Sequence, residues 1–253
     1  MKFKFLTLNT LHGGVFWDNL IEFIHKEDPD IAVFQEVYDG SDNNLEKRFR
    51  TIEEFKKEFP ELRYFKFEPT IIDSNNKVPW GNAVFSKYEI TSSRNYIFNP
   101  GLLEYDFEND LPSPAEVPEG ILEAEINLNG VNITVGSWHG VWDTHGKDTP
   151  ARDKMLKIIL ENLEGKENLI LAGDTNLNPD TEFVKKLESK LKIKSVFGDN
   201  LESTFNMLHK ENPGYATAVV DMIFISNNFK VIDKYMPMDD VSDHRPLVAI
   251  LEI

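Results

Sequence analysis

The chain has 253 residues, of which 41% are hydrophobic, and it contains no cysteine. This length allows one large α/β domain or two small ones, and the lack of cysteine excludes disulfides, thiolate metal sites and cysteine nucleophiles. The formal net charge is −16, without a basic cluster, which argues against tight nonspecific binding of long duplex DNA. Cleavage of a phosphoester is still compatible with this charge, because a bound metal can reverse the field locally.

The sequence also predicts the compartment in which the protein works. No apolar run reaches the roughly 20 residues that a membrane-spanning helix needs. The N-terminal segment MKFKFLTLNT has no apolar signal-peptide core and no small-residue cleavage site, so it predicts a strand of the fold. Because the absence of cysteine fits a reducing environment, we expect a cytoplasmic protein.

The N-terminal part of the chain alternates between strand and helix patterns. Period-two alternation predicts the strands, and apolar residues at helical spacing predict the helices. In chain order, the predicted elements are a strand at Lys2–Leu8, a helix around Trp17–Ile24, a strand at Asp30–Gln35, a helix around Leu45–Ile52 that closes near Pro60, and strands at Leu62–Phe67, Gly81–Ser86 and Glu89–Phe98.

Residues Asn99–Glu119 have no clear period, and they contain four prolines and several acidic residues but no basic one. Loops of this length are uncommon in compact domains and are often functional. One interpretation is a solvated acidic loop. The other is a lid or rim that screens substrates by their charge.

The second half is rich in strands. Asn129-Gly130 is a two-residue hairpin signal between two predicted strands, and Thr149 followed by Pro150 predicts the capped start of a helix. The predicted elements here are strands at Ile121–Leu128, Val131–Ser137, Asn168–Ala172, Asp221–Ser226 and Leu247–Ile253, and a helix at Asp180–Lys190. Because many strands are consecutive, we expect a two-sheet sandwich with helices on its outer faces, in a single domain over residues 1–253.

Polar side chains lie at the ends of several predicted strands, where residues that flank a buried strand can point into a cleft. They are Asn9, Glu36, His139, Asp174, Asn176, Asp221, Asp243 and His244. Taken singly, most of them have a plain structural interpretation, such as a strand-end turn or a hydrogen-bonded histidine. Asp221 is more telling, because an unpaired carboxylate inside an apolar run is costly. If they converge, they supply the metal ligands, water-orienting group and donors that phosphoryl transfer needs.

Several short motifs that contain these residues follow one another in a fixed order. They are Leu8-Asn9, Gln35-Glu36, Gly81-Asn82-Ala83-Val84-Phe85-Ser86, Trp138-His139, Gly173-Asp174-Thr175-Asn176, Val220-Asp221-Met222-Ile223-Phe224 and Ser242-Asp243-His244-Arg245-Pro246-Leu247. This ordered set strongly resembles the endonuclease/exonuclease/phosphatase superfamily, and the match runs from residue 2 to residue 253. The resemblance implies a four-layer α/β sandwich, in which two packed mixed β-sheets are flanked by helices and the site lies at one end of the sheets.

The resemblance also implies a divalent cation, Mg²⁺ or Mn²⁺. Glu36 would be its main ligand, with Asn9 and Asp243 nearby. Asp174 would orient and deprotonate the attacking water, and Asn176 would hold that water or a phosphoryl oxygen.

Two histidines complete the roles that the resemblance implies. Asp221 would hold His244 in place, and His244 would stabilise the charge that grows on the phosphoryl oxygens. His139 would bind the phosphate from the other side or assist the leaving group. One position departs from some branches of the family, which have an aspartate where this chain has Leu11, so we expect fewer protein ligands around the metal than in those branches.

The segment from residue 138 to residue 152 is dense in polar and aromatic groups. Because a helix N-terminus attracts anions, we expect Lys147 and Arg152 to contact a phosphate of the substrate. Trp142 could stack on a base or another ring. The alternative interpretation is a well-capped turn with a packed tryptophan.

The sequence thus favours a divalent-metal-dependent phosphoester hydrolase, a phosphodiesterase or phosphatase, acting on a small or end-bound phosphorylated substrate. An endonuclease, an exonuclease or an enzyme that processes nucleic-acid ends is the alternative, with a nucleic acid or nucleotide as its substrate. A catalytically silent binding module is the third hypothesis, and no protein partner is indicated.

Overall fold

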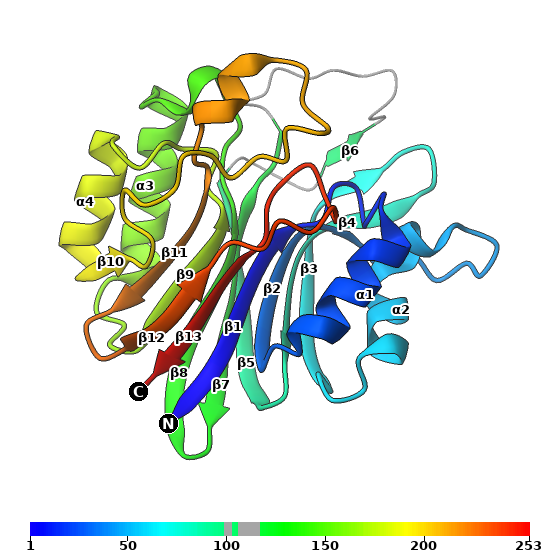
Figure 1. The fold of residues 1–253 in the computed structure, drawn as a ribbon, viewed down its shortest axis with the longest axis horizontal. Coiled ribbons are helices and arrows are strands. Elements are labelled where there is room, and N and C mark those ends of the chain that lie inside the picture. The colour runs from blue at the N-terminus through cyan, green and yellow to red at the C-terminus, as the bar shows by residue number, and fades with distance from the viewer. Residues whose placement is uncertain (99–102, 106–116) are drawn as a thin grey trace.

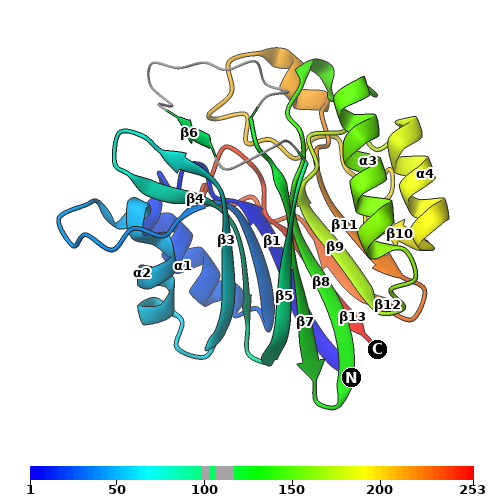
Figure 2. The ribbon, with the colours of Figure 1, turned by 180° about the vertical axis from the view of Figure 1, so that it is seen from behind.

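The computed structural model describes residues 1–98, 103–105 and 117–253. Two β-sheets pack face to face in it, and helices cover the outer face of each sheet (Figures 1 and 2). This is the four-layer α/β sandwich with two packed mixed sheets that the sequence predicts. No helix in the described part of the chain is both long and apolar enough to cross a membrane.

In the described residues, one sheet has seven strands in the order β12-β13-β1-β2-β4-β3-β6. Strand β1 is parallel to β2 and antiparallel to β13. The strands are β1 (Lys2–Asn9), β2 (Ile31–Tyr38), β3 (Tyr64–Asp73), β4 (Val78–Ser86), β6 (Leu103–Tyr105), β12 (Lys230–Tyr235) and β13 (Leu247–Glu252).

The other sheet has six described strands in the order β10-β11-β9-β8-β7-β5. Strands β8 and β9 are parallel, and β11 pairs with the other edge of β9 in the antiparallel sense. The strands are β5 (Glu89–Ile97), β7 (Gly120–Leu128), β8 (Val131–His139), β9 (Leu169–Asp174), β10 (Ile193–Ser195) and β11 (Asp221–Ser226).

Four α-helices form the outer layers in the described residues. Helices α1 (Trp17–Glu27) and α2 (Thr51–Glu58) lie against the seven-stranded sheet, whereas α3 (Pro150–Leu163) and α4 (Glu182–Leu191) lie against the six-stranded sheet (Figures 1 and 2). The predicted cap of α3 is confirmed, because Thr149 Oγ1 accepts a hydrogen bond from the backbone N–H of Arg152 and Pro150 is the first helical residue.

Side-chain alternation along β1 joins the layers. Phe3 and Phe5 point between the sheets into the central apolar cluster, whereas Leu6 and Leu8 belong to the cluster beneath α1 and α2. Burial on both faces explains why β1 has so many apolar residues, and each such side chain contributes on the order of 1.5–3 kcal/mol.

Several predicted elements have other bounds in the structure. The helix expected around Leu45–Ile52 starts later, because Lys47–Arg50 form a 3-10 turn that precedes α2. The second strand continues past Gln35 to Tyr38, so Glu36 lies within β2 rather than after it. Leu103–Tyr105, which were expected in a loop, pair with β3 as strand β6, while residues 99–102 and 106–116, on which the proposed lid or rim depends, lie outside the described residues.

Gly173 lies where β9 passes close to β8, and its φ of +145° is in the region that favours glycine. An added Cβ would be 1.9 Å from the carbonyl oxygen of Trp138. We therefore expect Gly173→Ala to lower the free energy of unfolding, measured by chemical denaturation, by about 2–4 kcal/mol.

The matched control for this prediction is Gly165→Ala. Gly165 also has a positive φ, of +88°, but no described atom beyond its chain neighbours lies within 4 Å of the added Cβ. Equal losses of stability in the two variants would contradict a specific role for the close approach of β9 to β8.

Candidate active site

The predicted site residues converge because the strand ladders align them. His139 at the end of β8 is paired with Asp174 at the end of β9, and Asp174 is paired on its other side with Asp221 at the start of β11. The carboxyl ends of parallel strands meet at one edge of a sheet. Three chemically active side chains therefore stand side by side at one end of the six-stranded sheet.

The seven-stranded sheet brings two more predicted residues to the same place. The amide nitrogen of Asn9, Nδ2, donates hydrogen bonds to Glu36 Oε1 at 3.0 Å and to Asp174 Oδ2 at 3.1 Å. This one amide group links carboxylates from the two sheets. Nearby, Gln35 Nε2 donates to Ser137 Oγ at 3.1 Å, which ties the sheets together behind the site.

Glu36 reaches the site through a β-bulge. The register of β2 against β4 shifts between Phe34 and Val37, and Glu36 has a φ of +60°, a left-handed conformation that is unusual for a residue other than glycine. Its Oε2 accepts a hydrogen bond from the backbone N–H of His12 at 2.9 Å. Burial opposes ionisation, but attraction to His12 and His139, together with hydrogen bonds, lowers the pKa of Glu36 to about 2.

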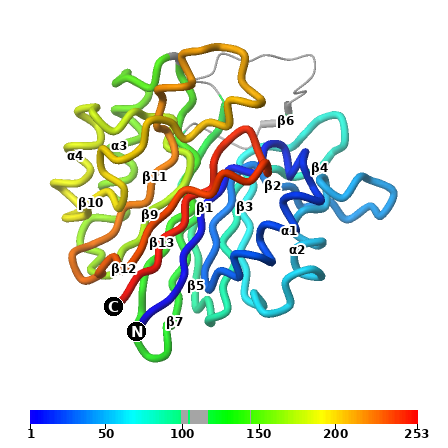
Figure 3. The backbone as a smooth tube through the Cα atoms, in the orientation of Figure 1, coloured from blue at the N-terminus to red at the C-terminus, as the bar shows by residue number. Residues whose placement is uncertain are grey.

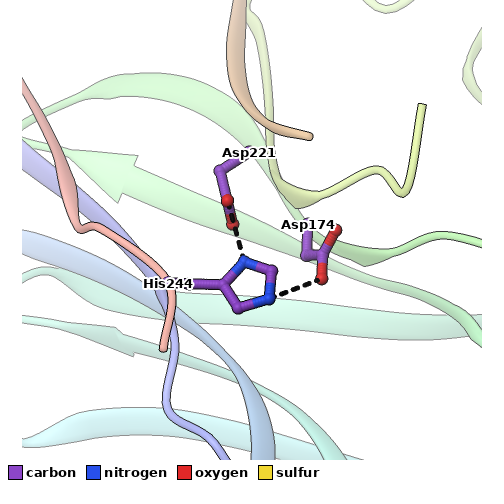
Figure 4. Close-up of side chains that lie close together, drawn as sticks. All are labelled: Asp174, Asp221 and His244. Atoms are coloured by element: carbon purple, nitrogen blue, oxygen red, sulfur yellow. Dashed lines mark hydrogen bonds and ion pairs between the residues drawn. The ribbon is translucent and has the colours of Figure 1, made fainter. Parts of the chain in front are cut away.

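His244 is held by Asp221 and faces Asp174 (Figure 4). Its Nδ1 lies 2.9 Å from Asp221 Oδ2, and its Nε2 lies 3.7 Å from Asp174 Oδ2. Burial disfavours the charged ring, but attraction to Asp221 and Asp174 outweighs burial and raises the pKa of His244 to about 10. The ring is therefore an imidazolium ion at neutral pH.

His139 has a matching arrangement on the other side of Asp174. Its Nε2 also lies 3.7 Å from Asp174 Oδ2, while its Nδ1 lies 3.0 Å from Glu119 Oε2. Burial opposes protonation of the ring, but the nearby carboxylates, above all Glu119, raise the pKa of His139 to about 9. Burial raises the pKa of Glu119 to about 7, because the attraction of His139 only partly offsets it.

Glu119 and His12 are site residues that the sequence reasoning did not find. Glu119 was one acid among many in the expected loop, yet it is 3% exposed and sits next to Gly120, which pairs with His139. Its position immediately before an apolar strand is the signal that could have found it. His12 follows the first strand by three residues, and its Nδ1 lies 3.9 Å from Glu36 Oε2.

Asn176 is bonded to a carboxylate and a backbone carbonyl, whereas Asp243 is bonded to a lysine. The backbone N–H of Asn176 donates to Asp174 Oδ1 at 3.0 Å, and its amide nitrogen donates to the carbonyl of Gly140 at 3.0 Å. Asp243 is held by the ammonium group of Lys210. Its predicted place among the metal ligands stays a prediction.

The predicted phosphate contact of Arg152 is wrong. Its side chain is fully buried, and its guanidinium group donates hydrogen bonds to the carbonyl oxygens of Val141, Lys147, Asp143 and Asn176. The loop carbonyls compensate the buried charge, so this arginine anchors the β8–α3 loop instead of meeting a ligand.

The other two predicted substrate-binding residues lie on the same β8–α3 loop. Lys147 is exposed, and no described contact tests its role. Trp142 is 48% exposed and lines a cavity together with Asn176. Its location beside a site residue is compatible with the predicted stacking on a ring.

The donor atoms of the site suit a hard divalent cation, since they are carboxylate and amide oxygens with imidazole nitrogen and no thiolate. Ligand atoms of Asp174, Asp221 and His244 lie within 4.8 Å of one another, which is close enough to hold one ion. A protonated His244 has no lone pair for a metal, however. Glu36, which is half-buried and shares the Asn9 amide with Asp174, therefore stays the predicted main ligand of the cation.

The sequence matches the endonuclease/exonuclease/phosphatase family over residues 6–244, and the chain belongs to this family. Members of the family are generally hydrolases that act on phosphoester bonds, and they typically depend on a divalent metal. The resemblance that the motifs carry is thus confirmed. Comparison with curated protein sequences gives no significant match.

Solved structures share the fold over the whole chain. An endonuclease/exonuclease/phosphatase from Beutenbergia cavernae is 16% identical with a TM-score of 0.75, covering 100% of this chain and 72% of its own. The human nocturnin catalytic domain is 18% identical with a TM-score of 0.72, covering 99% and 93%. A mannosyl-6-phosphatase from Bacteroides thetaiotaomicron is 17% identical with a TM-score of 0.70, covering 99% and 100%. At these identities the likeness establishes the fold alone.

The two buried imidazolium ions predict how stability depends on pH. Their folded pKa values, about 9 for His139 and about 10 for His244, exceed the ordinary value of 6.5. Such groups stabilise the fold fully below the ordinary pKa, and this stabilisation is lost as pH rises through the folded pKa. In chelator, we expect the free energy of unfolding to fall between about pH 7 and pH 10, measured by denaturant titration across that range.

In the same experiment, His139→Gln should flatten the decline up to about pH 9. The control is His25→Gln, which removes an exposed imidazole on α1 and should leave the slope unchanged. A wild-type slope in His139→Gln would mean that the ring is not protonated in the folded protein.

Proposed function

We propose that the protein is a divalent-metal-dependent hydrolase of phosphodiesters or phosphomonoesters, with Asp174 as the base that activates water. The observation that carries this proposal is the position of Asp174 Oδ2. It lies 3.7 Å from Nε2 of both His139 and His244, and it accepts a hydrogen bond from Asn9, which also contacts Glu36. A carboxylate between two imidazolium groups and beside an ionised glutamate has the parts that attack of water on phosphorus requires.

In this mechanism Asp174 accepts the proton of the attacking water. The backbone N–H of Asn176 holds Asp174 Oδ1, so that Oδ2 stays directed toward the space between the histidines. A fixed orientation matters because a general base acts only within hydrogen-bond reach of the proton that it removes.

The two imidazolium groups offset the negative charge that grows on the phosphoryl oxygens. Asp221 keeps His244 protonated and oriented, and Glu119 does the same for His139. Their Nε2 atoms both lie 3.7 Å from Asp174 Oδ2, so one ring can face the non-bridging oxygens while the other donates a proton to the leaving group.

The cation would be Mg²⁺ or Mn²⁺, held by Glu36 with Asn9 and Asp243 as the other candidate ligands. When bound, it supplies Lewis-acid neutralisation of the phosphoryl oxygens. A catalytically silent binding module is disfavoured, because such a module would gain nothing from several buried titratable groups that each cost free energy to desolvate.

We expect Asp174→Asn to lower turnover of bis(p-nitrophenyl) phosphate at least about 100-fold, because it removes the base while keeping the side-chain volume. His244→Gln should reduce turnover to a similar extent through loss of the imidazolium charge. Chelator should abolish the wild-type rate, and added Mg²⁺ or Mn²⁺ should restore it.

The control for this experiment is Asp199→Asn, which neutralises an exposed carboxylate outside the site. Its rate should equal that of the wild type, and denaturation curves should establish that each variant is folded. Wild-type turnover by Asp174→Asn would assign the base to another residue, and wild-type turnover in chelator would contradict a metal mechanism.

The size of the substrate separates the leading proposal from the nuclease alternative. The net charge of −16 repels long polyanions, so we propose a small or end-bound substrate. We expect turnover of a dinucleotide to change less than about threefold between roughly 50 and 200 mM salt, and duplex DNA to be cleaved far more slowly. Fast cleavage of duplex DNA with a steep loss of rate in salt would favour the nuclease.

A further inference from the structure

A cavity of about 420 Å³ opens beside the catalytic residues, between the β8–α3 loop and the loop that precedes β11. Both loops lie at the same end of the sandwich (Figure 3). Its described lining includes three aromatic residues, Trp142, Phe205 and Tyr215, and three asparagines, Asn176, Asn178 and Asn212. Its volume is in the range of small-molecule pockets, about 300–1,000 Å³.

Two of the lining residues connect this cavity to the catalytic centre. Asn176 is bonded to Asp174 through its backbone N–H. The ring of Phe205 packs on His244, with 4.6 Å between the ring centroids. A ligand in the cavity is therefore adjacent to both the proposed base and one of the imidazolium groups. A substrate whose phosphoester lies at Asp174 would place its leaving group or its remaining ester group here.

The chemistry of the walls fits a flat, uncharged ring. Trp142 presents an indole that is 48% exposed, and two further lining residues, Phe205 and Tyr215, pack together with 4.6 Å between their ring centroids. Among the described lining residues there is no lysine or arginine, and Asp143 is acidic. The described lining therefore has no lysine or arginine to pair with a second phosphate.

The polar part of the lining consists of amides. Asn178 uses its amide nitrogen to donate to the carbonyl of His145, and Asn212 uses its amide oxygen to accept from the backbone N–H of Gly214. The remaining atoms, an acceptor on Asn178 and a donor on Asn212, match a ring edge that carries both donors and acceptors. Nucleobases have such edges, whereas a purely hydrocarbon ring has none.

We propose that this cavity, called here the ring pocket, binds the nucleobase of a nucleotide substrate, with Trp142 as the stacking platform. Arg152 supports this role indirectly. Its guanidinium group donates hydrogen bonds to the carbonyls on either side of Trp142, at Val141 and Asp143, so the backbone that carries Trp142 is held in place before a ligand arrives. Preorganisation of this kind lowers the entropy lost on binding. The ring pocket rests on the proposed function only for the position of the phosphoester.

The test compares the binding of adenosine 5′-monophosphate, ribose 5-phosphate and mannose 6-phosphate by calorimetry, in chelator, so that no turnover occurs. We expect the wild type to bind the nucleotide about tenfold or more tightly than either sugar phosphate, because stacking of one base contributes on that scale. Trp142→Ala should abolish the preference, and Trp142→Phe should retain most of it. The control Leu208→Ala removes an apolar side chain that is 74% exposed and outside the pocket, and it should keep the wild-type preference.

Equal affinities of the wild type for all three compounds would overturn the proposal, and so would a preference for mannose 6-phosphate or a nucleotide preference that survives in Trp142→Ala. These outcomes are independent of catalysis. Turnover of bis(p-nitrophenyl) phosphate without a nucleotide preference would contradict nucleobase binding in the ring pocket but support the proposed hydrolase function. A nucleotide preference without turnover of any phosphoester would support nucleobase binding but contradict the hydrolase function.

Discussion

The pairing of β9 with β8 on one side and with β11 on the other is the constraint on which the rest of the site depends. It puts His139, Asp174 and Asp221 at adjacent register positions, although they are far apart in the sequence. Asn9 then joins this row to Glu36 in the opposite sheet. The site is therefore a property of the sandwich as a whole, because a shift of either ladder by one residue would turn its side chains to the other face.

Burial of so many acids is stable only because each has a compensating partner. Four carboxylates of the site, those of Glu36, Glu119, Asp174 and Asp221, are almost inaccessible or strongly desolvated, and imidazolium rings and amide donors stand between them. Without these partners, the desolvation of each charged carboxylate would cost free energy that no contact offsets. Backbone strain is concentrated in the same place, since Glu36 and Asn176 both have left-handed φ values. Strained residues persist where surrounding contacts over-determine them, and such places are often functional.

The layers of the fold and the polar residues at strand ends could be predicted from the sequence. An apolar run that is followed by an acid or a histidine can be recognised in the order of the residues alone. The sequence was insufficient where burial is decided by distant segments. Arg152, at the start of α3, looked like an anion-binding group, but four loop carbonyls surround its guanidinium. Glu119 looked like a solvated acid, but the hairpin of β7 and β8 brings it against His139. The bulge that aims Glu36 also leaves no signature in composition.

The placement of positive charge explains how so acidic a protein could still select an anionic ligand. Arg152 and Lys210 are occupied by carbonyls and by Asp243, and the described lining of the ring pocket contributes no cation. Next to Asp174, the positive charge that can attract a phosphate then comes from the imidazolium rings of His139 and His244, each with Nε2 3.7 Å from Asp174 Oδ2, and from the cation proposed for this site. A polyanion gains at that one point but is repelled along the rest of the surface over a Debye length of about 8 Å. A ligand with one phosphate and an uncharged ring would bind through both parts of the site: the phosphate to the positive groups beside Asp174, and the ring to the ring pocket. Because it carries little charge, the rest of the acidic surface would repel it only weakly.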